Sequence, residues 1–126
     1  MDFRFFANIV TYTFDKGIHI VGLADHDPPS SYVILQRGTE DDEQDEALGL
    51  DTYYMEVGED GVAGYGGVAS VSLQGEILNI ELSRDSAWPE GLALVTIVVR
   101  AIDRLEVLKQ GLMAIFASQA ITLRLD

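Results

Sequence analysis

Six carboxylates crowd into seven residues near the middle of the chain, and they are the side chains most able to do chemistry. They are Glu40, Asp41, Asp42, Glu43, Asp45 and Glu46, called the acidic run below. Burying unpaired carboxylates costs more free energy than folding supplies, so we predict that the run lies at the surface. Three kinds of chemistry suit it: a calcium site, acid–base catalysis, or attraction of a basic partner.

The spacing of the acidic run does not fit a calcium loop. Such a loop needs a glycine at its sixth position, whereas a loop starting at Asp41 has Glu46 there. Catalysis by two carboxylates needs different environments around a cleft, which a run alone does not provide. The chain has no cysteine and no serine in a G-x-S-x-G context. We therefore predict no catalytic residue, no metal site and no cofactor. A divalent-metal-binding protein or a small carboxylate enzyme is the alternative.

Two histidines and one glycine motif complete the candidates. His19 shares a predicted strand face with apolar residues, which favours a hydrogen-bonded structural histidine. His26 lies between Asp25 and Asp27, which could orient it. Residues 64–69 fit a degenerate G-x-G-x-x-A, but a dinucleotide fingerprint opens a helix and here a strand is predicted to follow. We interpret these glycines as turn residues.

The net charge of −13 is concentrated in one part of the chain. Residues 25–60 hold twelve acids and one base, a net charge of −11, whereas the other ninety residues hold nine acids and seven bases. Such a surface repels nucleic acid and anionic membranes and attracts a basic protein. The other interpretation is that the charge only keeps the protein soluble.

The elements that position these residues are mostly strands. Period-2 alternation over 68–73 and 77–82 predicts an antiparallel hairpin, and an apolar stripe over 103–118 predicts a helix. Further strands are predicted over 3–14, 18–23, 32–37, 52–57 and 94–100, with a frayed one at 121–125. We predict a single α+β domain over 1–126: a largely antiparallel sheet of about six or seven strands with one C-terminal helix packed on it.

Three local predictions accompany this fold. Phe6, Val10, Tyr12 and Phe14 are expected on one face of the first strand. The five glycines between Gly58 and Gly67 predict a turn with at least one positive φ. Short helical segments are expected over 42–48 and 84–92.

The acidic run is held between the predicted strands 32–37 and 52–57. We predict a partner-binding surface made of the acidic run together with Asp51, Tyr54 and Tyr65, because tyrosine supplies contact area at little entropic cost. The alternative for Tyr54 is a solvated position beside a buried Tyr53.

Five segments follow one another in the chain: YVILQR, the acidic run, LGLDTYYME, GYGG and LQGEILNIEL. In the order and spacing of these segments the chain resembles the Immunity protein 10 family, small proteins of bacterial polymorphic toxin systems. The resemblance covers about residues 8–116. It implies an antidote with an α+β fold that binds a cognate toxin domain. A cytoplasmic location is expected separately, because the sequence shows no signal-peptide pattern and no apolar run long enough to span a membrane. The negative charge of residues 25–60 further predicts that the toxin has a basic surface, as a nuclease does. No nucleic-acid or membrane partner is expected, and no oligomeric state is implied. A general acidic interaction module is the remaining alternative.

Overall fold

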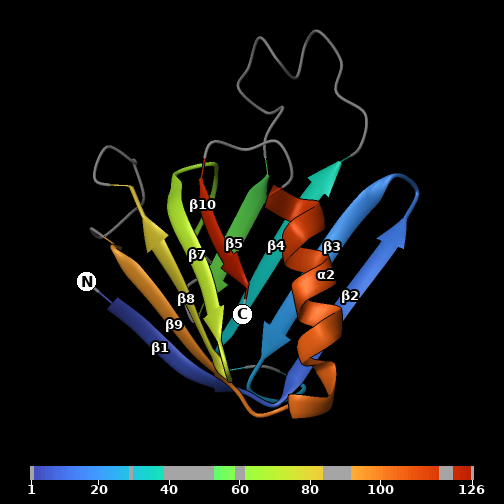
Figure 1. The fold of residues 1–126 in the computed structure, drawn as a ribbon, viewed down its shortest axis with the longest axis vertical. Coiled ribbons are helices and arrows are strands. Elements are labelled where there is room, and N and C mark those ends of the chain that lie inside the picture. The colour runs from blue at the N-terminus through green and yellow to red at the C-terminus, as the bar shows by residue number, and fades with distance from the viewer. Residues whose placement is uncertain are drawn as a thin grey trace, which may run out of the picture.

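The computed structural model describes residues 2–28, 30–38, 53–58, 62–83, 92–116 and 121–125. These residues form two five-stranded sheets and a C-terminal helix (Figure 1). Sheet A has the order β1-β9-β8-β7-β10, made of β1 (Asp2–Ala7), β9 (Leu94–Val99), β8 (Ile77–Leu82), β7 (Val68–Gln74) and β10 (Thr122–Leu125). Sheet B has the order β2-β3-β4-β5-β6, made of β2 (Ile9–Asp15), β3 (Ile18–Ala24), β4 (Tyr32–Gly38), β5 (Tyr54–Gly58) and β6 (Val62–Tyr65).

Among the described residues, the α+β class, the mainly antiparallel pairing and one C-terminal helix are confirmed. Within the described chain only β1 with β9 and β10 with β7 pair in parallel. The sheet itself differs from the prediction, because ten described strands divide between two sheets. In both parallel pairs, an edge strand of sheet A is joined to its partner by a long stretch of chain. The periodicity of a strand does not predict which distant strand it pairs with.

The predicted strand 3–14 is two strands that belong to different sheets. β1 ends at Ala7 and β2 begins at Ile9, and the backbone N–H of Asn8 between them donates to the carbonyl of Ala24 at 3.0 Å. The buried positions switch from odd to even residue numbers there, because Ala7 is fully buried in β1 whereas Val10 is buried in β2. The expectation that Phe6 shares the face of Val10 is therefore wrong, since Phe6 is 47% exposed.

The glycine-rich stretch contains a strand that the sequence prediction missed. β6 pairs antiparallel with β5, with Tyr54 opposite Tyr65. The predicted positive φ is confirmed at Gly66 (69°) and Gly67 (84°). These two residues carry the chain from β6 in sheet B to β7 in sheet A, through backbone angles that other residues rarely adopt.

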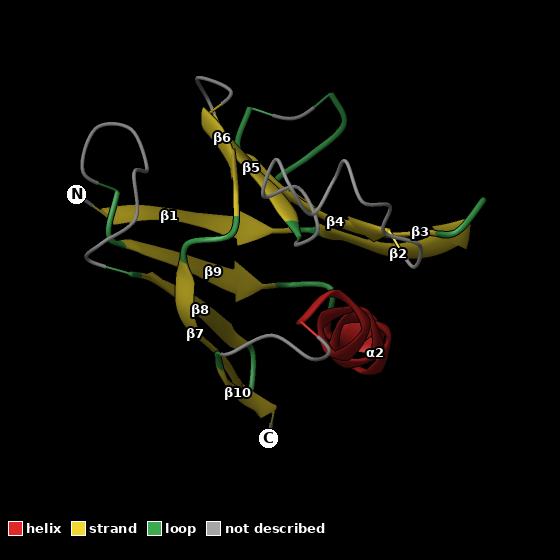
Figure 2. Cartoon of the chain, turned by 90° about the horizontal axis from the view of Figure 1, so that it is seen from above, coloured by secondary structure: helices red, strands yellow, loops and turns green. Residues whose placement is uncertain are grey.

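The helix α2 (Leu105–Phe116) follows a 3₁₀ turn, η2 (Ile102–Arg104), and packs on β2, β3 and β4. Figure 2 shows α2 on the same side of sheet B as β9 and β8. Its buried face consists of Leu108, Gly111, Leu112, Ile115 and Phe116. The core thus lies between the two sheets and this helix. No described helix is long and apolar enough to cross a membrane.

The helix predicted at 103–118 and the hairpin predicted at 68–73 and 77–82 are confirmed with small shifts of their ends. The last predicted strand is β10. The helical segments predicted at 42–48 and 84–92 lie outside the described residues.

Candidate functional site

The predicted partner-binding surface is only partly within the described chain. The acidic run and Asp51 lie outside it, between Gly38, which ends β4, and Tyr53, which precedes β5. These two strands are antiparallel neighbours in sheet B. Tyr65 pairs with Tyr54 through the backbone, and its side chain is outside the description. Of the predicted site, therefore, the side chain of Tyr54 is the one the structure places.

Tyr53 and Tyr54 have opposite environments, as alternation along a strand requires. Tyr53 is 2% exposed, and its hydroxyl accepts the backbone N–H of Val68 at 2.9 Å. Its ring meets Phe116 edge-on at 4.9 Å between centroids. The side chain of Tyr54 points to the other face of sheet B and is half-buried there. Of the alternative for these two residues, the buried Tyr53 is confirmed, whereas the solvated Tyr54 is not.

Tyr54 belongs to a carboxylate cluster that the sequence did not reveal. Its hydroxyl donates to Oε1 of Glu56 at 2.7 Å, and the hydroxyl of Tyr32 donates to Oε2 at 2.5 Å. The bond from Tyr32, and then that from Tyr54, hold the pKa of Glu56 below its usual value of 4.5, although partial desolvation acts the other way. The same bond raises the pKa of Tyr32. Glu56 is therefore an ionised carboxylate at neutral pH.

A hollow of about 400 Å³ adjoins this carboxylate on the face of sheet B turned away from α2. Its lining includes one cross-strand row, Thr11, Gly22, Ile34 and Glu56, that runs from β2 to β5. The next row adds Ile9, Ala24 and Tyr32. We call this site the Glu56 hollow. It is apolar apart from the hydroxyls of Thr11 and Tyr32 and the carboxylate of Glu56.

Gly22 contributes bare backbone to the lining of the hollow, with the hydroxyl of Thr11 beside it. An added Cβ there would lie 2.9 Å from Oγ1 of Thr11, on the neighbouring strand. Around it the side chains of Ile34 and Tyr32 stand out from the sheet, since alternate residues of a strand point to the same face. The floor of the hollow at this point therefore consists of the Gly22 backbone and the hydroxyl of Thr11, between larger residues.

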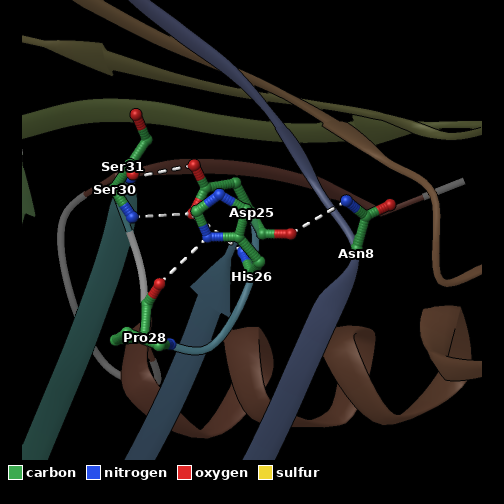
Figure 3. A network of polar contacts seen from close by, with 6 residues as sticks. All are labelled: Asn8, Asp25, His26, Pro28, Ser30 and Ser31. Carbon is green, nitrogen blue, oxygen red and sulfur yellow. Dashed lines mark hydrogen bonds and ion pairs between the residues drawn. The ribbon is translucent and has the colours of Figure 1, made fainter.

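The loop from β3 to β4 begins next to the hollow and is organised by Asp25 (Figure 3). Its carboxylate accepts three backbone N–H groups, from His26 at 2.8 Å, Ser30 at 3.0 Å and Ser31 at 3.1 Å. Desolvation raises the pKa of Asp25, but these bonds together lower it below the usual 3.8. The side chain of Asn8 holds the carbonyl of Asp25 at 2.8 Å. The Asp25 carboxylate therefore stabilises the loop to which it belongs.

The two histidines are also accounted for by local contacts. Nδ1 of His19 lies 2.8 Å from the hydroxyl of Tyr12, which confirms a hydrogen-bonded structural histidine. Nδ1 of His26 lies 3.0 Å from the carbonyl oxygen of Pro28 and 3.4 Å from Oδ1 of Asp25. Within the described chain, no three His, Cys, Asp or Glu side chains gather as metal ligands would.

Register explains why the sequence prediction missed Glu56 and Tyr32. The spacing of Tyr54 and Glu56 at i and i+2 places them on one strand face, which the sequence does show. That Tyr32 reaches Glu56 depends on the pairing of Ile34 with Glu56 across β4 and β5. Strand periodicity fixes the face of a residue but not its partner on the next strand.

The Glu56 hollow is concave and mostly apolar with one ionised carboxylate, as ligand-binding sites are, and it lies on a sheet face that no described helix covers. A family model described as Immunity protein 10 matches residues 6–105, and the chain belongs to this family. Proteins of this family are generally non-catalytic, and membership of it suggests a toxin-neutralising role. The resemblance drawn from the sequence is thus confirmed, although the match ends where α2 begins rather than at residue 116. No curated protein matches the chain.

Proposed function

We propose that this protein binds a cognate toxin domain and neutralises it by blocking its surface, without catalysis. The family membership supports the toxin-neutralising role. The observation that carries the mode of binding is the net charge of −11 over residues 25–60, against nine acids and seven bases in the rest of the chain. Charge held on one part of a small protein attracts a partner of opposite charge over longer distances than contact forces do.

The toxin surface that fits this charge is basic. Enzymes that cleave nucleic acid need positive surfaces to hold phosphates, so a nuclease is the toxin class we propose. The predicted contact surface is the acidic run with Asp51, Tyr54 and Tyr65, and Glu56 extends it along β5. We place the encounter in the cytoplasm of the cell that makes the toxin.

We expect the gene adjacent to this one to encode a multidomain toxin, and the test is co-expression with the C-terminal domain of that toxin. We expect that the toxin domain alone stops growth, that this protein restores it, and that the two purified chains form a stable complex. A toxin domain of unrelated sequence is the control, and it should stay toxic. Full toxicity of the neighbouring domain in the presence of well-expressed protein would exclude the proposed function.

A further inference from the structure

We propose that the Glu56 hollow receives one basic side chain of the toxin, an arginine or a lysine, as the anchor of the complex. This rests on the proposed function and adds to it the place and the chemistry of a specific contact. The stem of the side chain lies against Ile9 and Ile34, and its cation meets the carboxylate of Glu56.

The carboxylate of Glu56 has capacity left for a cation. Each of its two oxygens accepts one tyrosine hydroxyl, whereas an ionised carboxylate has about four lone-pair sites. Among the residues that the structure describes, no lysine, arginine or histidine forms an ion pair with Glu56. A negative charge beside apolar side chains is stabilised by an opposite charge, because the local dielectric is lower than that of water.

The apolar part of the hollow selects the shape of that cation. A small hydrated ion leaves Ile9, Ile34 and Ala24 without a contact, whereas arginine and lysine carry an apolar stem below the charge. Gly22 places no side chain in the path of such a stem, and the hydroxyl of Thr11 lies beside it. A hollow of about 400 Å³ accommodates one long side chain.

We expect the acidic run and the Glu56 hollow to act at different stages of binding. β4 and β5 line the hollow through Ile34 and Glu56, and the same two strands bracket the acidic run in the chain. Long-range charge increases the rate of encounter, whereas a partly desolvated charge pair determines how long the complex lasts. Glu56 is therefore the residue at which we expect the dissociation rate to be set.

The experiment that isolates the hollow uses n-butylguanidinium, which joins an apolar stem to a cation, and needs no toxin. The ¹⁵N-labelled protein is titrated and its amide shifts are followed. We expect saturable shifts at Thr11, Gly22, Ile34 and Glu56, in the row that lines the hollow. Glu56→Gln should weaken this binding about tenfold, since bonds to charged groups are worth more than neutral ones. Unchanged shifts in Glu56→Gln would overturn the proposal.

Two controls separate the cation from the stem and the hollow from general charge. n-Butanol shares the stem but has no charge, and it should give weaker shifts in the same row. Glu81→Gln removes one exposed carboxylate on the outer face of sheet A and should leave the titration unchanged. Ile34→Lys places a cation opposite Glu56 on the neighbouring strand, and it should abolish binding even if Glu56→Gln is unstable.

A measurement with the toxin domain distinguishes failure of the anchor from failure of the proposed function. We expect Glu56→Gln to raise the dissociation rate of the complex about tenfold and Glu81→Gln to leave it unchanged. Normal dissociation from Glu56→Gln, with neutralisation intact, would overturn the anchor and leave the proposed function standing. A wild-type protein that binds n-butylguanidinium but no toxin would overturn the proposed function instead.

Discussion

Two neutral hydroxyls, rather than a cation, lower the pKa of Glu56. Tyr32 and Tyr54 each donate to one carboxylate oxygen, and these bonds outweigh the partial desolvation of the group. A carboxylate satisfied in this way remains charged without an ion pair inside the protein. That distinguishes it from Asp25, whose bonds all come from its own loop. Of these two acids, Glu56 is the one suited to a partner.

The first prediction concerns the pH dependence of stability. The folded-state pKa of Glu56 is below 4.5, so its stabilising contribution is complete above that value and is lost as the pH falls through the folded-state pKa. We expect the free energy of unfolding of the wild type to exceed that of Glu56→Gln at neutral pH, with a gap that shrinks on acidification. Urea denaturation across this pH range measures the gap.

Tyr32→Phe provides the control for this prediction. It removes the hydroxyl with the largest effect on the pKa of Glu56 and leaves the carboxylate in place. In a Tyr32→Phe background the pH dependence caused by Glu56→Gln should therefore become smaller. A gap that stayed constant between neutral pH and pH values below 4.5 would show that the pKa of Glu56 is not lowered by folding.

At the level of single residues, the sequence predicted environments better than contacts. Alternation correctly separated a buried Tyr53 from a Tyr54 on the other face, and it placed His19 with the inward residues of β3. The pairing of Tyr32 with Glu56 and the hollow over Gly22 both depend on the register of neighbouring strands. Register is set by the whole sheet, so no local pattern could predict this part of the site.

The packing of α2 on sheet B depends on one glycine. A Cβ at Gly111 would lie 2.5 Å from Cγ2 of Val21 and 3.1 Å from the ring of Tyr12. Val21 is fully buried and β-branched, so it has little freedom to move aside. A glycine normally weakens a helix by about 1 kcal/mol relative to alanine. Here it lets the helix approach β3 closely.

Gly111→Ala should therefore destabilise the protein despite the better helix propensity. Overpacking of a filled core costs about 1–3 kcal/mol, which exceeds the gain in propensity of about 1 kcal/mol over most of that range. A lower urea midpoint is the expected result. Gln110→Ala, at the exposed neighbouring position, is the matched control and should change stability by less than about 0.5 kcal/mol. A raised midpoint for Gly111→Ala would contradict the close approach.

Leu112→Ala tests the same helix by removing volume. Leu112 is fully buried, and truncation of a buried leucine costs about 2–5 kcal/mol through lost contacts and a cavity. Met113→Ala on the same helix is the control, because Met113 is 52% exposed and should tolerate the change. Equal urea midpoints for the two variants would place α2 outside the core.

Elements with a clean period were predictable and elements at sheet boundaries were not. The hairpin of β7 and β8 and the stripe of α2 repeat their pattern several times, so local physics determines them. The division of residues 3–14 at Asn8 reflects a change of sheet, which the continuous apolar character of the segment conceals. β6 is short and contains Gly64, so its propensity favoured a turn and only pairing with β5 makes it a strand.

At the scale of the whole molecule, the two sheets separate different kinds of surface. The row Arg4, Thr96, Asn79, Ser72 and Arg124 crosses the outer face of sheet A, with an arginine at each edge strand. In sheet B, β4 and β5 bracket the acidic run, and the stretch 25–60 to which they belong carries most of the net charge. A basic partner is therefore expected to approach from the side of sheet B.

The last prediction tests whether the acidic run steers that approach. Neutralising its six carboxylates to Gln or Asn removes six of the twelve acids in residues 25–60. Charge concentrated in this way raises association rates about 10- to 1,000-fold at low salt, so the variant should associate with the toxin domain much more slowly. Its rate should also lose most of its salt dependence, since screening acts over about 8 Å at physiological ionic strength.

The matched control removes the same charge from acids spread over the rest of the chain. These are Asp2, Asp15, Glu76, Glu81, Asp103 and Glu106. If position matters, this control should keep most of the wild-type rate and salt slope, because the focused field of residues 25–60 is intact. Stopped-flow association at several salt concentrations compares the three proteins. Equal rates and slopes for the acidic-run variant and the wild type would mean that the run only keeps the protein soluble. The partner would then be recognised by the Glu56 hollow without electrostatic guidance from the run.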